Sequence, residues 1–125
     1  MEKILVIKIR ALGDVLRTTC ILPGLHEKFP NPHVEWLTST EAVPFLSNNL
    51  LITKVITKEY FTNLKLSEKQ YGLVINLEDD EWACALAASV KATTLIGAYS
   101  LNGVKCYTDD SSRWFDMSLI SRYGK

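Results

Sequence analysis

The sequence has little cysteine and no net charge, and both absences exclude classes of protein. Its 125 residues include three cysteines, Cys20, Cys84 and Cys106, with no CxxC spacing among them. We expect these cysteines to be reduced, small core residues of a cytoplasmic protein rather than disulfide partners or metal ligands. His26 and His33 have no Cys, Asp or His at metal-ligand spacing, so we expect surface residues and no metal site.

The charges cancel, since 14 basic and 14 acidic residues give a formal net charge of +0. A neutral chain has no long-range field with which to gather a phosphate backbone, so we expect no nucleic-acid partner. No apolar run approaches the roughly 20 residues that a bilayer crossing needs, which predicts no transmembrane segment. The start, Met1-Glu2-Lys3, leads at once into an apolar run, and we expect no signal peptide.

Glycine-rich phosphate loops are also missing. Neither GxGxxG nor the P-loop signature occurs, and no nucleophile elbow surrounds any serine. Dinucleotide binding, P-loop phosphoryl transfer and acyl transfer therefore have no support, and we expect no bound cofactor.

What the sequence does contain is enough apolar material for one core, because 47% of the residues are hydrophobic. Continuous apolar runs at 4–9 and 71–77 are typical of strands buried on both faces of a parallel sheet. The other predicted elements are a helix at 14–28 that Pro23 kinks or splits, strands at 33–38, 54–57 and 93–97, and helices at 40–46 and 78–91. This alternation predicts an α/β fold, a Rossmann-like three-layer sandwich with a mostly parallel sheet.

The last part of the chain is harder to interpret. Residues 98–110 are ambiguous, with a hairpin as one possibility, and residues 112–123 are predicted to be helical. The segment from Trp114 to Tyr123 is too apolar for a free tail. We therefore expect that the chain is part of a longer protein.

Ligands of open parallel sheets bind beyond the carboxyl ends of the strands, which directs attention to the loop after the first strand. Gly13 there permits a tight turn, and Asp14 stands at the positive end of the following helix dipole. An ionised carboxylate in this place could act as a general base toward a hydroxyl, although capping of the helix is an equally simple role. Lys8, Arg10 and Arg17 cluster around the loop and could hold a phosphate, or could be solvated surface.

A second candidate is the acidic run Glu78-Asp79-Asp80-Glu81, which directly follows the strand ending at Leu77. Acidic residues in a first helical turn stabilise the dipole, which is the simpler interpretation. In the functional interpretation, one or two of these acids face the crevice beyond the carboxyl ends of the strands and bind sugar hydroxyls or a divalent ion. At least half of the four must then be solvated.

Two segments together resemble a known family. KILVIKIRALGDVLRTTCILPGLHEKFPN followed by VEWLT is similar to the start of a glycosyltransferase family 9 enzyme, the heptosyltransferase-like group. These sequences open with a strand, a GD loop, a helix carrying LxTT and an FP ending. YGLVINLEDDEWACALAASVKATTLIGA resembles a later segment of the family, so the similarity runs from Lys3 to about Gly103. One departure is Cys20, where members often carry proline.

The resemblance implies a two-domain GT-B enzyme, with residues 1–125 as the N-terminal acceptor-binding domain and the donor-binding domain absent from this chain. It implies Asp14 as the catalytic base of inverting sugar transfer, typically from ADP-heptose, to a lipopolysaccharide or other cell-envelope glycan. A lipid-linked acceptor would place a cytoplasmic enzyme at the inner face of the membrane. The alternative is a stand-alone flavodoxin-like binding or signalling module without transferase chemistry. The candidate substrate-binding residues are Gly13, Arg10, Arg17, Thr18 and Asp79.

Overall fold

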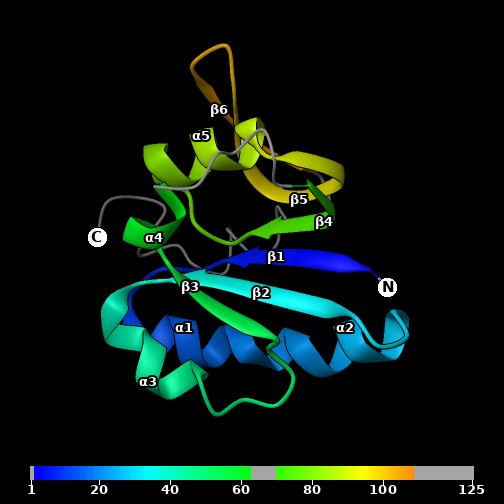
Figure 1. Ribbon diagram of the computed structural model, residues 1–125. Helices are drawn as coiled ribbons and strands as arrows, with labels where there is room; N and C mark the ends of the chain where they lie inside the picture. Colours follow the sequence, from blue (N-terminus) through cyan, green and yellow to red (C-terminus); the bar gives the residue numbers. More distant parts are fainter. Residues whose placement is uncertain (1, 63–69, 109–125) are drawn as a thin grey trace.

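A computed structural model describes residues 2–62 and 70–108 as an α/β fold (Figure 1). Two 3-10 helices, Thr19–Ile21 and Thr40–Ala42, accompany the strands and α-helices. In chain order the strands and α-helices are β1 (Lys3–Ile7), α1 (Leu12–Thr18), α2 (Leu22–Lys28), β2 (His33–Thr38), α3 (Val43–Leu46), β3 (Lys54–Thr57), α4 (Lys58–Thr62), β4 (Gln70–Asn76), α5 (Glu81–Ser89), β5 (Lys91–Leu101) and β6 (Val104–Tyr107).

The strands form one six-stranded sheet in the order β3-β2-β1-β4-β5-β6. All neighbours pair in parallel except β5 and β6, which are antiparallel. The chain runs outward from β1 through β2 to β3 and then returns to β4 on the other side of β1. The predicted Rossmann-like architecture is therefore confirmed, and the strand order reverses between β1 and β4.

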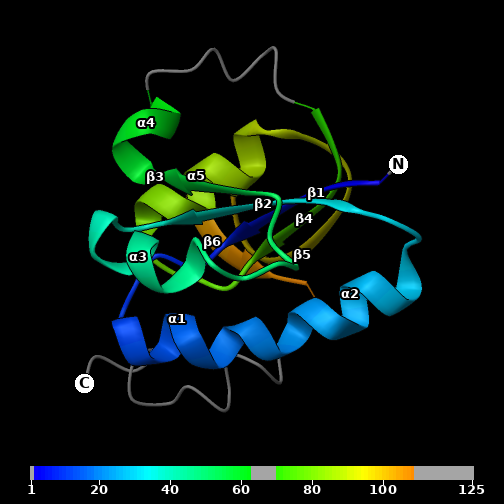
Figure 2. The ribbon, with the colours of Figure 1, turned by 60° about the horizontal axis from the view of Figure 1, so that its bottom comes forward.

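Helices cover both faces of the sheet, which gives three layers (Figures 1 and 2). On β1, Ile4 and Val6 join the core cluster under α1, α2 and α3, while Leu5 and Ile7 join the cluster under α4 and α5. All four are fully buried. Successive side chains of a strand point to opposite faces, so a strand between two helical layers must be apolar throughout.

The helices differ more from the prediction than the strands do. The helix predicted at 14–28 begins earlier, at Leu12, and is split into α1, a 3-10 helix and α2. Pro23 lies in the first turn of α2, where its missing N–H group costs nothing. The helix predicted at 78–91 is shorter at both ends: it begins at Glu81, where Asp80 caps it, and ends at Ser89, and Lys91 already belongs to β5. Helix α4 was not predicted.

The hairpin considered for residues 98–110 is present as β5 and β6. Its turn consists of Asn102 and Gly103, which both have positive φ angles, 53° and 80°. Such two-residue turns match the twist of antiparallel strands. The helix predicted at 112–123 and the apolar segment from Trp114 to Tyr123 lie outside the described residues.

The cysteines occupy three different environments. Cys84 is buried, as predicted, and Cys106 is partly buried, but Cys20 is exposed. The prediction that all three are core residues is therefore wrong for Cys20. It lies in the 3-10 helix between α1 and α2, which contains no buried residue.

Candidate functional site

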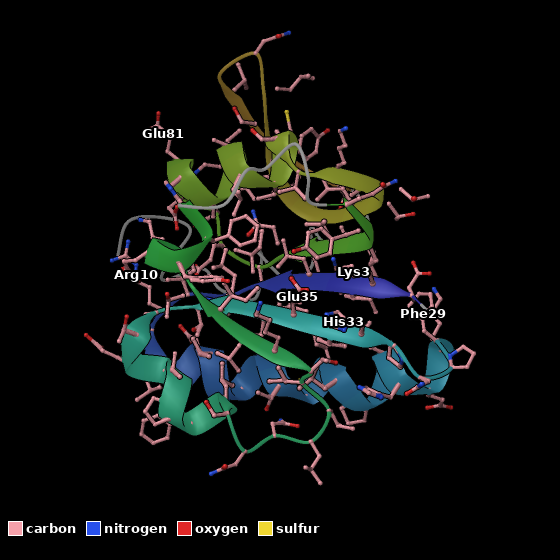
Figure 3. The ribbon with its side chains drawn as sticks, in the orientation of Figure 1. Lys3, Arg10, Phe29, His33, Glu35 and Glu81 are labelled. Atoms are coloured by element: carbon pink, nitrogen blue, oxygen red, sulfur yellow. The ribbon has the colours of Figure 1, made fainter. Side chains whose placement is uncertain are left out.

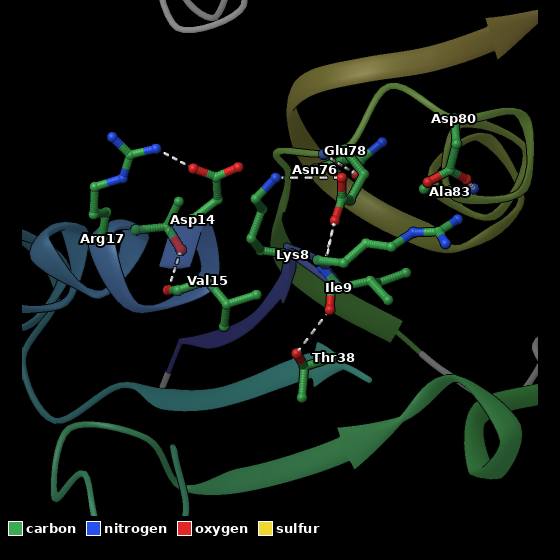
Figure 4. Close-up of polar contacts among 12 residues, drawn as sticks. Lys8, Ile9, Asp14, Val15, Arg17, Thr38, Asn76, Glu78, Asp80 and Ala83 are labelled. Atoms are coloured by element: carbon green, nitrogen blue, oxygen red, sulfur yellow. Dashed lines mark hydrogen bonds and ion pairs between the residues drawn. The ribbon is translucent and has the colours of Figure 1, made fainter. Parts of the chain in front are cut away.

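The candidate site lies where β1 and β4 end side by side (Figure 4). Ile7 and Asn76 are register partners at the carboxyl ends of these strands. The loops that follow, residues 8–11 and 77–80, are therefore neighbours at the position where the strand order reverses. In open α/β sheets this is the position where ligands bind.

Asp14 projects from the first turn of α1, beside this pair of loops. Helix α1 begins at Leu12, and the capping position belongs to Ala11, which has no side-chain acceptor. Asp14 is thus the third helical residue, and the alternative that it caps the helix is wrong. Its carboxylate pairs with the Arg17 guanidinium one turn further on, and the two side chains are 33% and 80% exposed. The structure therefore presents a carboxylate open to solvent at the positive end of a helix.

Gly13 does not have the role that the sequence suggested. It is the second residue of α1 and has no positive φ angle. A Cβ atom placed on it would meet nothing within 4 Å. The turn into α1 therefore needs no glycine, and the residue leaves open space beside Asp14.

Glu78, one of the four acids of the candidate run, has contacts that the sequence interpretation did not foresee. Its carboxylate is buried and points back into the loop after β1. One oxygen, Oε2, accepts hydrogen bonds from the backbone N–H groups of Ile9 at 2.6 Å and Arg10 at 2.8 Å. The other, Oε1, lies 3.3 Å from the Lys8 ammonium, and both side chains of this ion pair are 10% exposed.

The acidic run thus divides into different roles. Glu78 is buried, whereas Asp80 caps α5 by accepting a hydrogen bond from the Ala83 N–H at 2.8 Å. Glu81 is exposed in the first turn of that helix. The simpler interpretation, that these acids stabilise a helix start, is confirmed for Asp80 and Glu81.

The candidate substrate-binding residues differ in their exposure to solvent. Arg10 is exposed in the loop after β1, and Asp79 is half-buried next to Glu78. Thr18 is fully buried, and its hydroxyl donates to the Val15 carbonyl oxygen at 2.6 Å. A buried hydroxyl that is already bonded within its helix cannot meet a substrate, so the proposed contact by Thr18 is wrong. Lys8 is likewise taken up by Glu78 rather than open to a phosphate.

Arg10 borders a cavity of about 260 Å³ on the α4 side of the loop. Its lining includes two basic residues, Arg10 and Lys58, and three acidic ones. The Lys58 ammonium lies 4.6 Å from the centre of the Trp82 ring. The full lining is Ile9, Arg10, Ser39, Glu41, Lys58, Glu59 and Asp80.

No protein-family model and no curated protein sequence matches the chain. Among solved structures it is similar to a glycosyl transferase of family 9 from Veillonella parvula DSM 2008, with a TM-score of 0.65 and 22% identity over 78% of this chain and 32% of that one. The chain shares its fold with part of a family 9 glycosyltransferase.

Two Escherichia coli enzymes share the same fold. Heptosyltransferase WaaC with ADP has a TM-score of 0.60 and 19% identity, over 76% of this chain and 34% of that one. ADP-heptose lps heptosyltransferase II has a TM-score of 0.60 and 21% identity, over 70% and 28%. The resemblance predicted from the sequence is confirmed at the level of the fold. The chain spans about a third of the length of these glycosyltransferases.

The histidines are more enclosed than predicted. His26 and His33 are half-buried rather than simple surface residues, and they contact the Leu51 carbonyl oxygen at 2.8 Å and the Glu35 carboxyl at 2.9 Å. Residues 2–62 and 70–108 contain no group of three His, Cys, Asp or Glu side chains that could hold a metal ion. None of the helices in these two ranges has the length and apolar character needed to span a membrane.

Proposed function

We propose that this chain is the acceptor-binding domain of an inverting glycosyltransferase. The enzyme transfers a sugar, with ADP-heptose as the first candidate donor, to a hydroxyl of lipopolysaccharide or another cell-envelope glycan. Residues 1–125 supply the acceptor side, and a second domain outside them binds the nucleotide sugar. The shared fold with family 9 glycosyltransferases supports the class of enzyme. A lipid-linked acceptor places the reaction at the inner face of the cytoplasmic membrane.

The observation that carries the proposal is the position of Asp14. Its carboxylate is partly exposed at the ligand-binding edge of the sheet, next to the loops after β1 and β4. The acceptor hydroxyl takes the place of the Arg17 guanidinium and gives its proton to Asp14. The hydroxyl oxygen attacks the anomeric carbon while the bond to the nucleoside diphosphate breaks on the opposite face, and the configuration inverts.

The neighbouring residues have supporting roles in this proposal. Arg10 and Arg17 bind polar or anionic groups of the acceptor, and half-buried Asp79 accepts a sugar hydroxyl. Gly13 keeps the space beside Asp14 open, because its missing side chain leaves nothing within 4 Å. Thr18 packs α1 against the sheet and makes no contact with the acceptor.

The substitution Asp14→Asn in the intact protein tests the base. It preserves size and removes the proton acceptor, so turnover should fall by about two orders of magnitude or more while the fold is kept. We would supply ADP-heptose and a set of ADP- and UDP-sugars, with an extract of cell-envelope glycolipids as acceptor, and detect the product by mass spectrometry.

The matched control is Glu27→Gln, which neutralises an exposed carboxylate on α2. It should leave turnover unchanged. If Asp14→Asn also leaves turnover unchanged, Asp14 is not the base. If the wild-type protein transfers no sugar from any donor, the proposed function is wrong and the stand-alone binding module gains support.

A further inference from the structure

Glu78 connects two loops that are about 70 residues apart in the sequence. Its Oε2 atom accepts both backbone bonds, from Ile9 and from Arg10, while its Oε1 atom pairs with Lys8. Strand β1 ends at Ile7, so the N–H groups of Ile9 and Arg10 lie beyond the sheet ladder. A single buried carboxylate therefore satisfies two consecutive donors of the loop that leads to Asp14.

Glu78 is itself fixed to the centre of the sheet. Its backbone N–H donates to the Asn76 Oδ1 atom at 3.0 Å. The Asn76 amide then donates to the Ala98 carbonyl oxygen on β5 at 2.8 Å. Figure 4 shows Asn76, Glu78 and Lys8 meeting beside the start of α1. The polar connection thus runs from β5 through β4 to the loop after β1.

The loop holds the start of α1 in turn. The Ala11 carbonyl oxygen accepts the first hydrogen bond of that helix, from the Val15 N–H at 2.9 Å. Asp14 lies in this same first turn. Between the Arg10 N–H, which Glu78 binds, and Ala11 there is one peptide bond. The loop that Glu78 binds is therefore joined directly to the first turn of α1, which carries Asp14.

We propose that Glu78 is a positioning residue that fixes the loop of residues 8–11 and thereby aims the Asp14 carboxylate at the acceptor hydroxyl. The inference rests on the proposed function. Lys8 neutralises the buried carboxylate, and its task is electrostatic balance rather than substrate binding. Displacement of a catalytic group by about 1 Å can lower a rate by about 100-fold. Loss of the two backbone hydrogen bonds to Glu78 should therefore affect turnover, although Glu78 touches no reacting atom.

Two variants of the intact protein separate the effect of the two backbone hydrogen bonds accepted by Glu78 from the effect of its ion pair with Lys8. Glu78→Ala removes the acceptor of both backbone bonds, and kcat should fall about 10- to 100-fold with KM for the acceptor changed less than about threefold. The double variant E78Q/K8M keeps one carbonyl oxygen for both N–H groups and leaves no unpaired ammonium. It should recover most of the turnover. Glu81→Ala, an exposed carboxylate of the same acidic run, is the matched control and should behave as wild type.

Hydrogen–deuterium exchange measured by mass spectrometry reports on the loop without any substrate. Exchange in a peptide covering residues 8–14 should rise in Glu78→Ala, return toward wild type in E78Q/K8M and stay unchanged in Asp14→Asn. The pH profile of kcat supplies a further distinction. A positioning role lowers kcat at every pH, whereas loss of the ascending limb in Glu78→Ala would make Glu78 the base itself and overturn the inference.

The outcomes keep the two proposals apart. The inference fails if folded Glu78→Ala keeps wild-type kcat and loop exchange, or if E78Q/K8M is as slow as Glu78→Ala. The proposed function fails instead if Asp14→Asn is fully active or the wild type transfers no sugar. In that case the exchange data still decide whether Glu78 fixes the loop.

Discussion

At the scale of the residue, a second buried carboxyl group organises the opposite end of the sheet. Glu35 on β2 accepts a hydrogen bond from the Tyr71 hydroxyl of β4 at 2.7 Å and contacts His33 at 2.9 Å. The Lys3 ammonium of β1 lies 4.0 Å from the same carboxyl group and 5.2 Å from the centre of the Tyr71 ring. Figure 3 shows Lys3, His33 and Glu35 near one another, away from Arg10. The contacts join three central strands, which indicates a structural role.

Tyr71→Phe tests this role. The variant loses the hydrogen bond to a buried carboxyl group, so the free energy of unfolding should fall by about 1–3 kcal/mol at neutral pH. Chemical denaturation followed by circular dichroism measures the loss. Tyr60→Phe, which alters a tyrosine that is 48% exposed, is the control and should change stability little.

The stability difference between wild type and Tyr71→Phe should also depend on pH. Burial, and then the bond to Glu35, raise the pKa of Tyr71 above its ordinary value of 10.0. The unfolded chain therefore loses this proton first, and the contribution of Tyr71 is present below pH 10 and declines as the pH rises further. The stability difference between wild type and Tyr71→Phe should shrink above pH 10. A constant difference up to pH 11 would contradict the raised pKa.

At the scale of the element, the places of β1 to β5 could be predicted from the sequence, but the helix ends could not. The bounds of β5 were also missed, since the strand was predicted at 93–97 and is found at Lys91–Leu101. The strands predicted at 33–38 and 54–57 have these bounds in the structure. Their patterns depend on burial, which the residue types record directly. Helix ends depend on single backbone groups and their partners. Helix α5, for example, begins at Glu81, where Asp80 caps it by accepting from the Ala83 N–H. Glu78 lies before this cap with its carboxylate on the loop after β1, and no local pattern shows that contact.

In the candidate site, too, features with a local sequence signal could be predicted and features that depend on distant contacts could not. Asp14 could be found from the sequence because a carboxylate after Gly13, just beyond a buried strand, is a local signal. Glu78 could be noticed as acidic but not as buried, since its partners are backbone N–H groups far away in the sequence. Thr18 belongs to the same LxTT segment as Arg17, yet one faces the core and the other faces solvent.

Alanine substitutions at two glycines should change the free energy of unfolding in opposite directions. Gly97 on β5 has a φ angle of 121°, and a Cβ atom there would lie 1.9 Å from the Asn76 carbonyl oxygen. Gly97→Ala should therefore lower the free energy of unfolding by roughly 2–4 kcal/mol. Gly13→Ala has open space and helical geometry, so it should raise stability by about 0.5–1 kcal/mol. Denaturation of both variants measures the two effects, and equal destabilisation would contradict the described backbone.

At the scale of the whole molecule, the proposal divides the reaction between this chain and a second domain. Its charges balance at 14 basic and 14 acidic residues, and no glycine-rich phosphate loop occurs in the sequence. The chain covers 28–34% of the length of the E. coli glycosyltransferases compared with it, WaaC and heptosyltransferase II. The proposed division places the base at Asp14 and the stabilisation of the leaving nucleoside diphosphate in another domain.

Residues 1–125 alone should therefore neither bind nor use a nucleotide sugar. Titration calorimetry with ADP-heptose should give no heat above that of dilution, and no glycosylated product should form with the glycolipid extract as acceptor. The intact protein under the same conditions is the control, and it should do both. Transfer by the isolated chain would show that both substrates bind to this one domain. The division of labour between two domains would then be wrong, although Asp14 could still be the base.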